Sequence, residues 1–295
     1  MSTPAETAVT AETAVTAVSA EAFAADWAAW HAAHERHRAD PHGFLAVTHL
    51  HWLGAEPARL DGAPGTWSVE NDVVRLVLRA GERVLRDGQE LNSDGTGATV
   101  ILGPIAEREG LTLRVEDAGA GHTVIELAKR GGQYVVRPRH PLNPLLTSYR
   151  GTPAYAPNPE YSARGIFVPF EQPQTTTVGA AVEGIQHVYE APGELRFRLH
   201  GEDLVLTAFN GHTPGTLSVL FTDATSGTTT YAANRSLSVA APGPDGTVTL
   251  DFNRAVNLPC AYTDLATCPL PPSQNRLPVA VEAGEQIPYE RQDAA

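Results

Sequence analysis

Residues 67–78, WSVENDVVRLVL, are the stretch that decides the fold. Apolar and polar residues alternate on both sides of Asn71 and Asp72, and valine is a residue type that favours strands. Asparagine and aspartate are typical turn residues, because they tolerate the left-handed backbone conformation. The stretch therefore predicts two strands that are joined by a tight turn.

Strand-like segments of this kind make up most of the chain after residue 66. They are TVILG (99–103), LTLRVEDAG (111–119), HTVIELAKR (122–130), QYVVRP (133–138), LRFRLHG (195–201), DLVLTAFNG (203–211), TLSVLFTD (216–223) and TVTLDFN (247–253). Strands and helices do not alternate along the chain, so a dinucleotide-binding sheet is not expected. We predict a mainly β fold, with a sandwich or barrel-like body that could divide into two β subdomains.

Residues 19–38, SAEAFAADWAAWHAAHERHR, have convincing helical periodicity. Ser19 is a suitable N-cap, and Glu21 is an acidic residue in the first turn. An aromatic stripe recurs at spacings of four and three residues, and it consists of Phe23, Trp27 and Trp30. We predict one long N-terminal helix that packs on the β body through this stripe.

The same helix carries His31, His34 and Glu35 at helical spacing. This set has the residue types of a metal site, but such residues are also common on a solvated helix face. We interpret them as a solvated polar face.

The chain is expected to consist of a tail and one domain. Residues 1–18 contain a tandem repeat of AETAVT, and an Ala/Thr-rich segment of this kind predicts a disordered tail. The single domain would span residues 19–287. Its parts would be the helix (19–38), a first β group (66–137), a Pro-rich connection (138–173) and a second β group that ends in an irregular loop (174–287).

Charge and hydropathy limit the partners. The net charge of the 295 residues is −13, so nucleic-acid binding is not expected. No apolar run approaches the ~20 residues of a membrane span, and the N-terminus lacks the basic and apolar regions of a secretory signal. We therefore expect a cytoplasmic protein that binds neither nucleic acid nor membranes. Oligomeric state is left open.

A possible metal motif lies in GFLAVTHLHWLGAE, residues 43–56. His49, His51 and Glu56 have the spacing of the first metal-binding motif of cupins, and alternate residues of a strand share one face. The second cupin motif is absent. The alternative is a half-buried strand with incidental histidines.

Residues 251–277, DFNRAVNLPCAYTDLATCPLPPSQNRL, have almost no helical or strand periodicity, and they contain both cysteines. Cys260 and Cys268 are eight positions apart, which fits neither a C-x-x-C redox pair nor a zinc knuckle. A disulfide is unexpected in the cytoplasm. Cys260 is either a nucleophile or a small apolar residue that packs inward.

Amide and guanidinium side chains gather at the two ends of this stretch, together with Asp251. They are Asn253, Arg254, Asn257, Asn275 and Arg276. Such groups either satisfy the backbone of a buried irregular loop or hold an anionic ligand, and both options stay open. We predict that the loop is buried and walls the functional pocket.

The stretches 223–231 (DATSGTTTY) and 251–285 resemble a bacterial family called domain of unknown function 1684, and GFLAVTHLHWL (43–53) resembles it more loosely. The resemblance extends from about residue 23 to residue 287. His49 stands where the family is expected to have glycine. The resemblance implies a fold and no particular activity, because the family has no established general reaction.

These observations predict a cytoplasmic enzyme of unassigned reaction that acts on a small anionic metabolite in a pocket lined by Arg, Asn and Asp. The candidate catalytic residues are Asp251, Arg254 and Cys260. The candidate substrate-binding residues are His51, Arg137, His140, Asn143, Tyr231, Arg235, Asn253, Asn275 and Arg276.

Two other functions stay open. One is a non-catalytic β module that binds a ligand or a partner. The other is a metal-dependent, cupin-like enzyme that uses His49, His51 and Glu56. The sequence implies no cofactor. It also lacks the G-x-S-x-G motif of a typical serine hydrolase and the alternation of strands and helices of an NAD-dependent dehydrogenase.

Overall fold

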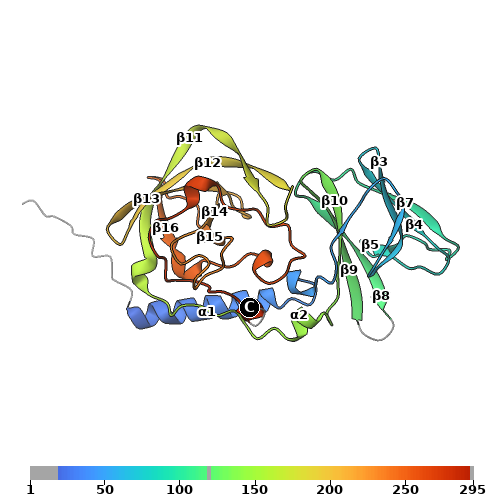
Figure 1. Cartoon of the computed structure of the whole chain (residues 1–295), viewed down its shortest axis with the longest axis horizontal. Helices are drawn as coiled ribbons and strands as arrows, with labels where there is room; N and C mark the ends of the chain where they lie inside the picture. Colours follow the sequence, from blue (N-terminus) through green and yellow to red (C-terminus); the bar gives the residue numbers. More distant parts are fainter. Residues whose placement is uncertain (1–18, 118–120, 293–295) are drawn as a thin grey trace, which may run out of the picture.

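The computed structural model describes residues 19–117 and 121–292, and the predicted tail at 1–18 lies outside them. Strands dominate the described residues, so the predicted mainly β fold class is confirmed. Figure 1 shows two β bodies side by side, with the N-terminal helix running below the larger one. Each body has its own hydrophobic core.

The N-terminal body consists of two sheets. The six-stranded sheet has the order β1-β10-β9-β8-β5-β6, with β1 (His51–Trp52), β10 (Gln133–Arg139), β9 (Gly121–Arg130), β8 (Gly110–Asp117), β5 (Leu85–Arg86) and β6 (Gln89–Glu90). The four-stranded sheet has the order β2-β3-β4-β7, with β2 (Ala58–Leu60), β3 (Ala63–Glu70), β4 (Val73–Leu78) and β7 (Ala98–Leu102). Their shared core includes Trp67, Leu76 and Ile125.

The hairpin predicted from residues 67–78 is formed by β3 and β4. Glu70 pairs with Val73, so the loop has two residues. These are Asn71 and Asp72, with φ values of 50° and 60°. Two successive residues at positive φ are what a tight hairpin turn needs, because their twist matches that of the strands.

The C-terminal body is a six-stranded sheet with the order β15-β14-β13-β12-β11-β16. Its strands are β11 (Ser162–Gly179), β12 (Gln186–Leu199), β13 (Glu202–Asn210), β14 (Leu217–Phe221), β15 (Arg235–Val239) and β16 (Thr247–Asp251). The core of this body includes Leu195, Leu206, Phe221 and Phe252.

The irregular connection between the bodies is shorter than the Pro-rich stretch 138–173, because β11 begins at Ser162. The connection contains α2 (Pro144–Thr147) and the 3-10 turn η2 (Pro159–Tyr161). Two prolines of the stretch, Pro169 and Pro173, fall inside β11. The pairing of β11 with β12 shifts register between Pro169 and Gln174. A strand tolerates proline at such an irregularity, where a ladder hydrogen bond is already missing.

The helix predicted over residues 19–38 is α1 (Ala20–Arg38). Ser19 caps it, since its hydroxyl oxygen accepts from the Ala22 N–H at 3.1 Å. The aromatic stripe is half-buried against the C-terminal body, and the same inward face continues to Arg38, which is buried. Within the described residues no helix is both long and apolar enough to cross a bilayer.

The last part of the chain packs against the C-terminal body and carries little regular structure. Its elements are η3 (Phe252–Arg254), η4 (Pro259–Ala261), η5 (Ser273–Asn275) and α3 (Tyr289–Gln292). Between the bodies lies η1 (Phe44–Ala46), where the sequence predicted a strand. Only His51 and Trp52 of that region pair as a strand.

Candidate functional site

The segment 251–277 is held by asparagine side chains that bind backbone groups. Asn275 is fully buried; its Oδ1 accepts from the Thr207 N–H at 2.8 Å, and its Nδ2 donates to the carbonyls of Thr207 and Leu220, both at 2.9 Å. The Asn253 side chain exchanges two hydrogen bonds with the backbone of Asn158. An amide carries both donors and an acceptor, so it can replace missing ladder partners. Both asparagines stabilise the irregular chain.

Arg235 is also fixed by its surroundings. It is 1% exposed, and it donates to the Asp223 carboxylate at 2.8 Å and to the carbonyls of Val281 and Ala283. Burial lowers the pKa of Arg235, and the charge of Asp223 opposes this. The guanidinium therefore joins β15 to the end of the chain and has no open side for a ligand.

Asp251 and Arg254 attach α1 to the C-terminal body. Arg254 pairs with Asp26 of the helix and with Asp251, and its guanidinium lies 5.3 Å from the centre of the Trp30 ring. Trp27 donates its indole N–H to the Asn253 carbonyl at 2.7 Å. Two of the three predicted catalytic residues thus dock the helix.

The third predicted catalytic residue lies in a different cluster. Cys260 is buried with Ala266 and Cys268, and Tyr231 donates to the Cys260 carbonyl at 2.8 Å. The structure therefore does not bring Asp251, Arg254 and Cys260 into one site. The inward packing that the sequence suggested for Cys260 is observed.

The cupin-like residues do not form a metal site. The rings of His49 and His51 stack with centroids 5.5 Å apart, but His51 Nε2 is hydrogen-bonded to the Asp61 carbonyl and Glu56 is exposed. Within residues 19–117 and 121–292, one set of three groups has ligand atoms within 4.8 Å of one another, and it is His31, Glu35 and Glu285.

The other predicted binding residues are dispersed. Asn143 donates to the carbonyls of Leu45 and Val47 and so holds η1 in place. The His140 ring accepts from the Leu142 N–H, and Arg276 is exposed next to β14. Of the predicted binding residues, Arg137 lines a cavity together with a second arginine, Arg139.

A buried polar cluster joins α1 to the connection and to the C-terminal segment. We call it the Arg38–Glu285 cluster, and its members are His34, Glu35, Arg38, Tyr149, Thr152, Tyr262 and Glu285. Arg38 is at its centre and donates to Glu285 at 2.7 Å, to Glu35 at 3.0 Å and to Thr152 at 2.5 Å. The interpretation of His34 and Glu35 as a solvated face is therefore wrong, because that face of the helix is turned toward Glu285.

The hydroxyl groups of the cluster connect its charged members. Tyr149 donates to Glu35 at 2.6 Å, and the Tyr262 and Thr152 hydroxyls are 2.8 Å apart. Burial raises the pKa of both tyrosines, so they stay protonated. Burial alone would raise the pKa of Glu285, but hydrogen bonding with His34 and the charge of Arg38 outweigh it and hold the pKa below its usual value. Glu285 is therefore ionised at neutral pH.

The carboxylates of this cluster already have a cation. The Arg38 guanidinium bridges Glu35 and Glu285, and Glu285 also accepts from the Asn257 N–H at 2.6 Å. A metal ion between His31, Glu35 and Glu285 would have to compete with Arg38 for the same oxygens. The donor set does not favour a metal.

A groove of about 440 Å³ lies against this cluster, at the C-terminal end of α1. It is lined by His34, His37, Arg38, Asp40, His42, Gly43, Phe44, Arg139 and Asn257. Asn257 is 5% exposed, and its Oδ1 has no hydrogen-bond partner. Buried side-chain oxygens without a partner are rare, and this one lies on a residue that lines the groove.

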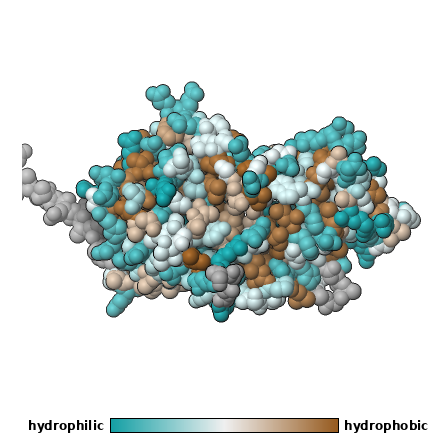
Figure 2. Space-filling model, viewed as in Figure 1, coloured by the Kyte–Doolittle hydropathy of each residue, from teal (hydrophilic) through white to brown (hydrophobic). Residues whose placement is uncertain are grey.

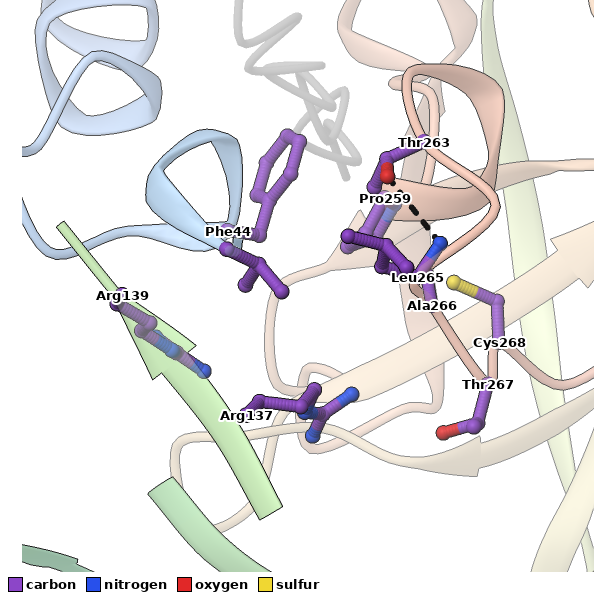
Figure 3. A pocket seen from close by; sticks show the side chains of 10 residues that line it. Phe44, Arg137, Arg139, Pro259, Thr263, Leu265, Ala266, Thr267 and Cys268 are labelled. Carbon is purple, nitrogen blue, oxygen red and sulfur yellow. Dashed lines mark hydrogen bonds between the residues drawn. The ribbon is translucent and has the colours of Figure 1, made fainter. Parts of the chain in front are cut away.

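A second cavity, of about 170 Å³, lies beside the groove. Figure 3 shows Arg137 and Arg139 of β10 on one side of it, Phe44 of η1 on another, and the residues from Pro259 to Cys268 opposite the arginines. Phe44 and Arg139 line both spaces, which are therefore neighbours. In Figure 2, apolar residues gather where the two bodies meet on this face.

Two arginines of the cavity, Arg137 and Arg139, share the carboxylate of Glu126. Arg130 does not line the cavity, but it also lies within ion-pair distance of Glu126. Burial alone would make Glu126 harder to ionise. The charges of Arg137 and Arg139 outweigh burial and lower the pKa of Glu126. Burial and the charge of Arg137 lower the pKa of Arg130. Glu107 is a further carboxylate near Arg130. The excess of positive charge is therefore at the cavity itself, where Arg137 and Arg139 share the single carboxylate of Glu126.

Most of the groove cannot be predicted from the sequence patterns. The helical pattern predicts that His34 faces the solvent, and no pattern marks Arg38 or Glu285 as a site residue. One available signal is Glu285, which stands in the stretch that carries the family resemblance. A second is the continuation of the inward helix face from Trp27 and Trp30 to positions 31, 34 and 38.

The chain belongs to the family described as protein of unknown function DUF1684, whose model matches residues 147–286. The match contains most of the connection, all of the C-terminal body and most of the C-terminal segment. The looser resemblance at residues 43–53 lies outside it. Tyr149, Thr152, Asn257, Tyr262 and Glu285 all fall within the matched residues.

A solved structure is similar to part of the chain. It is the solution NMR structure of an uncharacterized protein from Haloarcula marismortui, 33% identical, and the match covers 48% of this chain and 78% of that one, with a TM-score of 0.41. No curated protein matches the chain. The comparisons therefore give a family and no activity.

Proposed function

We propose that the protein is an enzyme that binds a small molecule with a carboxylate or phosphate group in the groove and cavity between its two β bodies. Arg137 and Arg139 would hold the anionic group. His34, Arg38 and Asn257 would contact the rest of the molecule. The cytoplasmic location stays a prediction from the sequence.

The charge balance at Glu126 is the observation that carries this proposal. One carboxylate cannot neutralise the two guanidinium groups that line the cavity, and a partly buried excess of positive charge is costly without a further anion. The planar guanidinium suits a carboxylate or phosphate, since it can donate two parallel hydrogen bonds. The free volume next to these arginines, about 440 Å³ in the groove, is in the range of small-molecule sites.

The Arg38–Glu285 cluster favours an enzyme over a simple binding module. His34 lines the groove, its Nε2 lies 2.6 Å from Arg38 and 3.5 Å from Glu285, and imidazole is the usual group for moving a proton near neutral pH. Arg38 and Glu285 would fix the orientation of this ring. The non-catalytic module that the sequence left open would need no such group beside its ligand.

A thermal-shift screen with small carboxylates and phosphates tests the binding. A bound compound at roughly 100 times its Kd should raise the melting temperature by about 5 °C. The Arg139→Gln variant should lose this shift. The matched control is Arg75→Gln, which removes an exposed arginine from β4 and should keep the full shift.

The outcome that contradicts the proposal is a compound that shifts wild type and Arg139→Gln equally, since it would bind elsewhere. The enzyme is then separated from the module by NMR of the bound compound, incubated with a small amount of protein. Conversion by wild type and none by His34→Gln would support catalysis. An unchanged compound with intact binding would leave a binding module.

A further inference from the structure

The two cysteines lie together in a buried cluster, although eight positions separate them. The Cys260 N–H donates to the Cys268 sulfur at 3.3 Å, and the two residues are 4% and 7% exposed. Both belong to a cluster that also contains Ala266 and is covered by Tyr231 and Leu258. Both thiols are free. The chain has two cysteines in all, so this cluster contains every thiol of the protein.

One of the two sulfurs faces the space between the β bodies. Cys268 lines the cavity of about 170 Å³, and Figure 3 shows its sulfur next to the turn formed by Thr263, Leu265 and Ala266. A molecule the size of a peroxide that enters this cavity reaches the Cys268 side of the pair. Cys260 lies behind it, on η4.

The two thiols differ in acidity. Hydrogen bonding with Cys268 lowers the pKa of Cys260, although burial opposes this. The same hydrogen bond and burial raise the pKa of Cys268. The thiolate is the reactive form of cysteine, so an asymmetric pair has one sulfur suited to attack and one that keeps its proton.

We propose that Cys260 and Cys268 form a redox-active pair that a hydroperoxide oxidises reversibly to an intramolecular disulfide. One of the two sulfurs attacks the peroxide oxygen; the O–O bond breaks, and an alcohol or water leaves with a proton from the pair. The other sulfur then attacks the resulting sulfenic acid, an S–S bond forms, and a molecule of water leaves. The two sulfurs lose two electrons, and the peroxide gains them.

This proposal does not depend on the ligand of the groove. It also agrees with the reduced state expected in a reducing compartment, because the pair would form a disulfide only when an oxidant is present. The sequence spacing does not suggest a redox pair. The chain reverses between residues 260 and 268, and this reversal brings the sulfurs together.

Treatment of the native protein with excess hydrogen peroxide tests the proposal. The intact mass should fall by two hydrogen atoms, and neither cysteine should react with iodoacetamide after unfolding. Both should react again after dithiothreitol. Trypsin leaves both cysteines in one peptide, 255–276, but chymotrypsin cleaves after Tyr262 and separates them. The oxidised protein should therefore yield one disulfide-linked chymotryptic pair.

Two variants test the sulfenic acid step. Cys260→Ser and Cys268→Ser each leave one thiol without a partner, so neither should form an intramolecular disulfide. Dimedone should label the remaining cysteine in the variant that keeps the attacking sulfur. The proposal is overturned if native wild type keeps two alkylatable thiols after peroxide, if a disulfide forms only between two chains, or if each cysteine gains oxygen without forming a bond to the other.

Discussion

Arg235 and Arg139 are both held by carboxylates and carbonyl groups, yet they differ in charge balance. Arg235 is buried in the C-terminal body and has Asp223 as its own counter-ion. Arg139 lies between the bodies and shares Glu126 with Arg130 and Arg137. The Nε atom of each lacks a hydrogen-bond partner. The two regions therefore differ in two respects: Arg139 shares its counter-ion with other arginines, and it lines a cavity.

This difference separates a structural arginine from one that is available to a ligand. A buried charge with a matched partner is costly to disturb, because removal of one partner leaves the other charge without compensation. A site with surplus positive charge can lose one guanidinium with little cost to folding. Substitution should consequently cost much more stability in the first region than in the second.

The largest effect is expected for Asp223→Asn. The Asp223 carboxylate receives hydrogen bonds from Arg235 at 2.8 Å and from the N–H and hydroxyl of Thr225 at 2.8 and 2.6 Å. Its neutralisation would leave the Arg235 charge buried without a partner, so the free energy of unfolding should fall by about 3–5 kcal/mol. Urea denaturation followed by tryptophan fluorescence measures this change.

Asp203→Asn is the matched control, since it makes the same change in an ion pair whose two side chains are 69% and 87% exposed. Its effect should stay within about 0.5 kcal/mol. Equal losses of unfolding free energy in the two variants would show that burial of the Asp223–Arg235 pair does not increase its contribution to stability.

A smaller effect, which depends on pH, is expected for Glu285→Gln. Near neutral pH the variant should be less stable than wild type by about 2–3 kcal/mol, because Arg38 loses its main counter-ion. The pKa of Glu285 is held below its ordinary value of 4.5. The advantage of wild type is therefore present in full above that pH, and it should disappear as the pH falls through the lower, folded-state pKa.

Unfolding free energies of both proteins, measured at a series of pH values from about 7 to about 3, test this. Glu202→Gln, an exposed change in β13, serves as the control and should follow wild type. A gap between wild type and Glu285→Gln that stays constant on acidification would contradict the assigned ionisation.

Local patterns were sufficient for the class of fold. Asn71 and Asp72 encode their hairpin within a few residues, and Ser19 caps α1 with its own side chain. The boundary of β11 was harder to predict. Its prolines lie at an irregularity of the β11–β12 pairing, and a register shift depends on the partner strand, which is distant in sequence.

The site could not be predicted because its parts are far apart in the chain. Arg38 and Glu285 are 247 positions apart, and neither has a neighbour in sequence that reveals the pairing. In the sequence, an arginine or asparagine near proline is equally able to bind a ligand or to donate hydrogen bonds to a buried backbone. Burial decided between these options for Asn275 and Arg235. Arg137 lines a cavity and is therefore the predicted residue that we retain in the proposed binding site.

The smallest effect on stability is expected for Arg139→Gln, which tests the difference between the two regions directly. Loss of one of three guanidinium groups removes a contact to Glu126 but also relieves repulsion by Arg130 and Arg137, so the free energy of unfolding should change by less than about 1 kcal/mol. Arg235→Gln should lose several times more, since it strands Asp223. Urea denaturation of the two variants side by side makes the measurement. A loss from Arg139→Gln as large as that from Arg235→Gln would mean that Arg139 is structural, and the cavity would then have no spare positive charge for an anion.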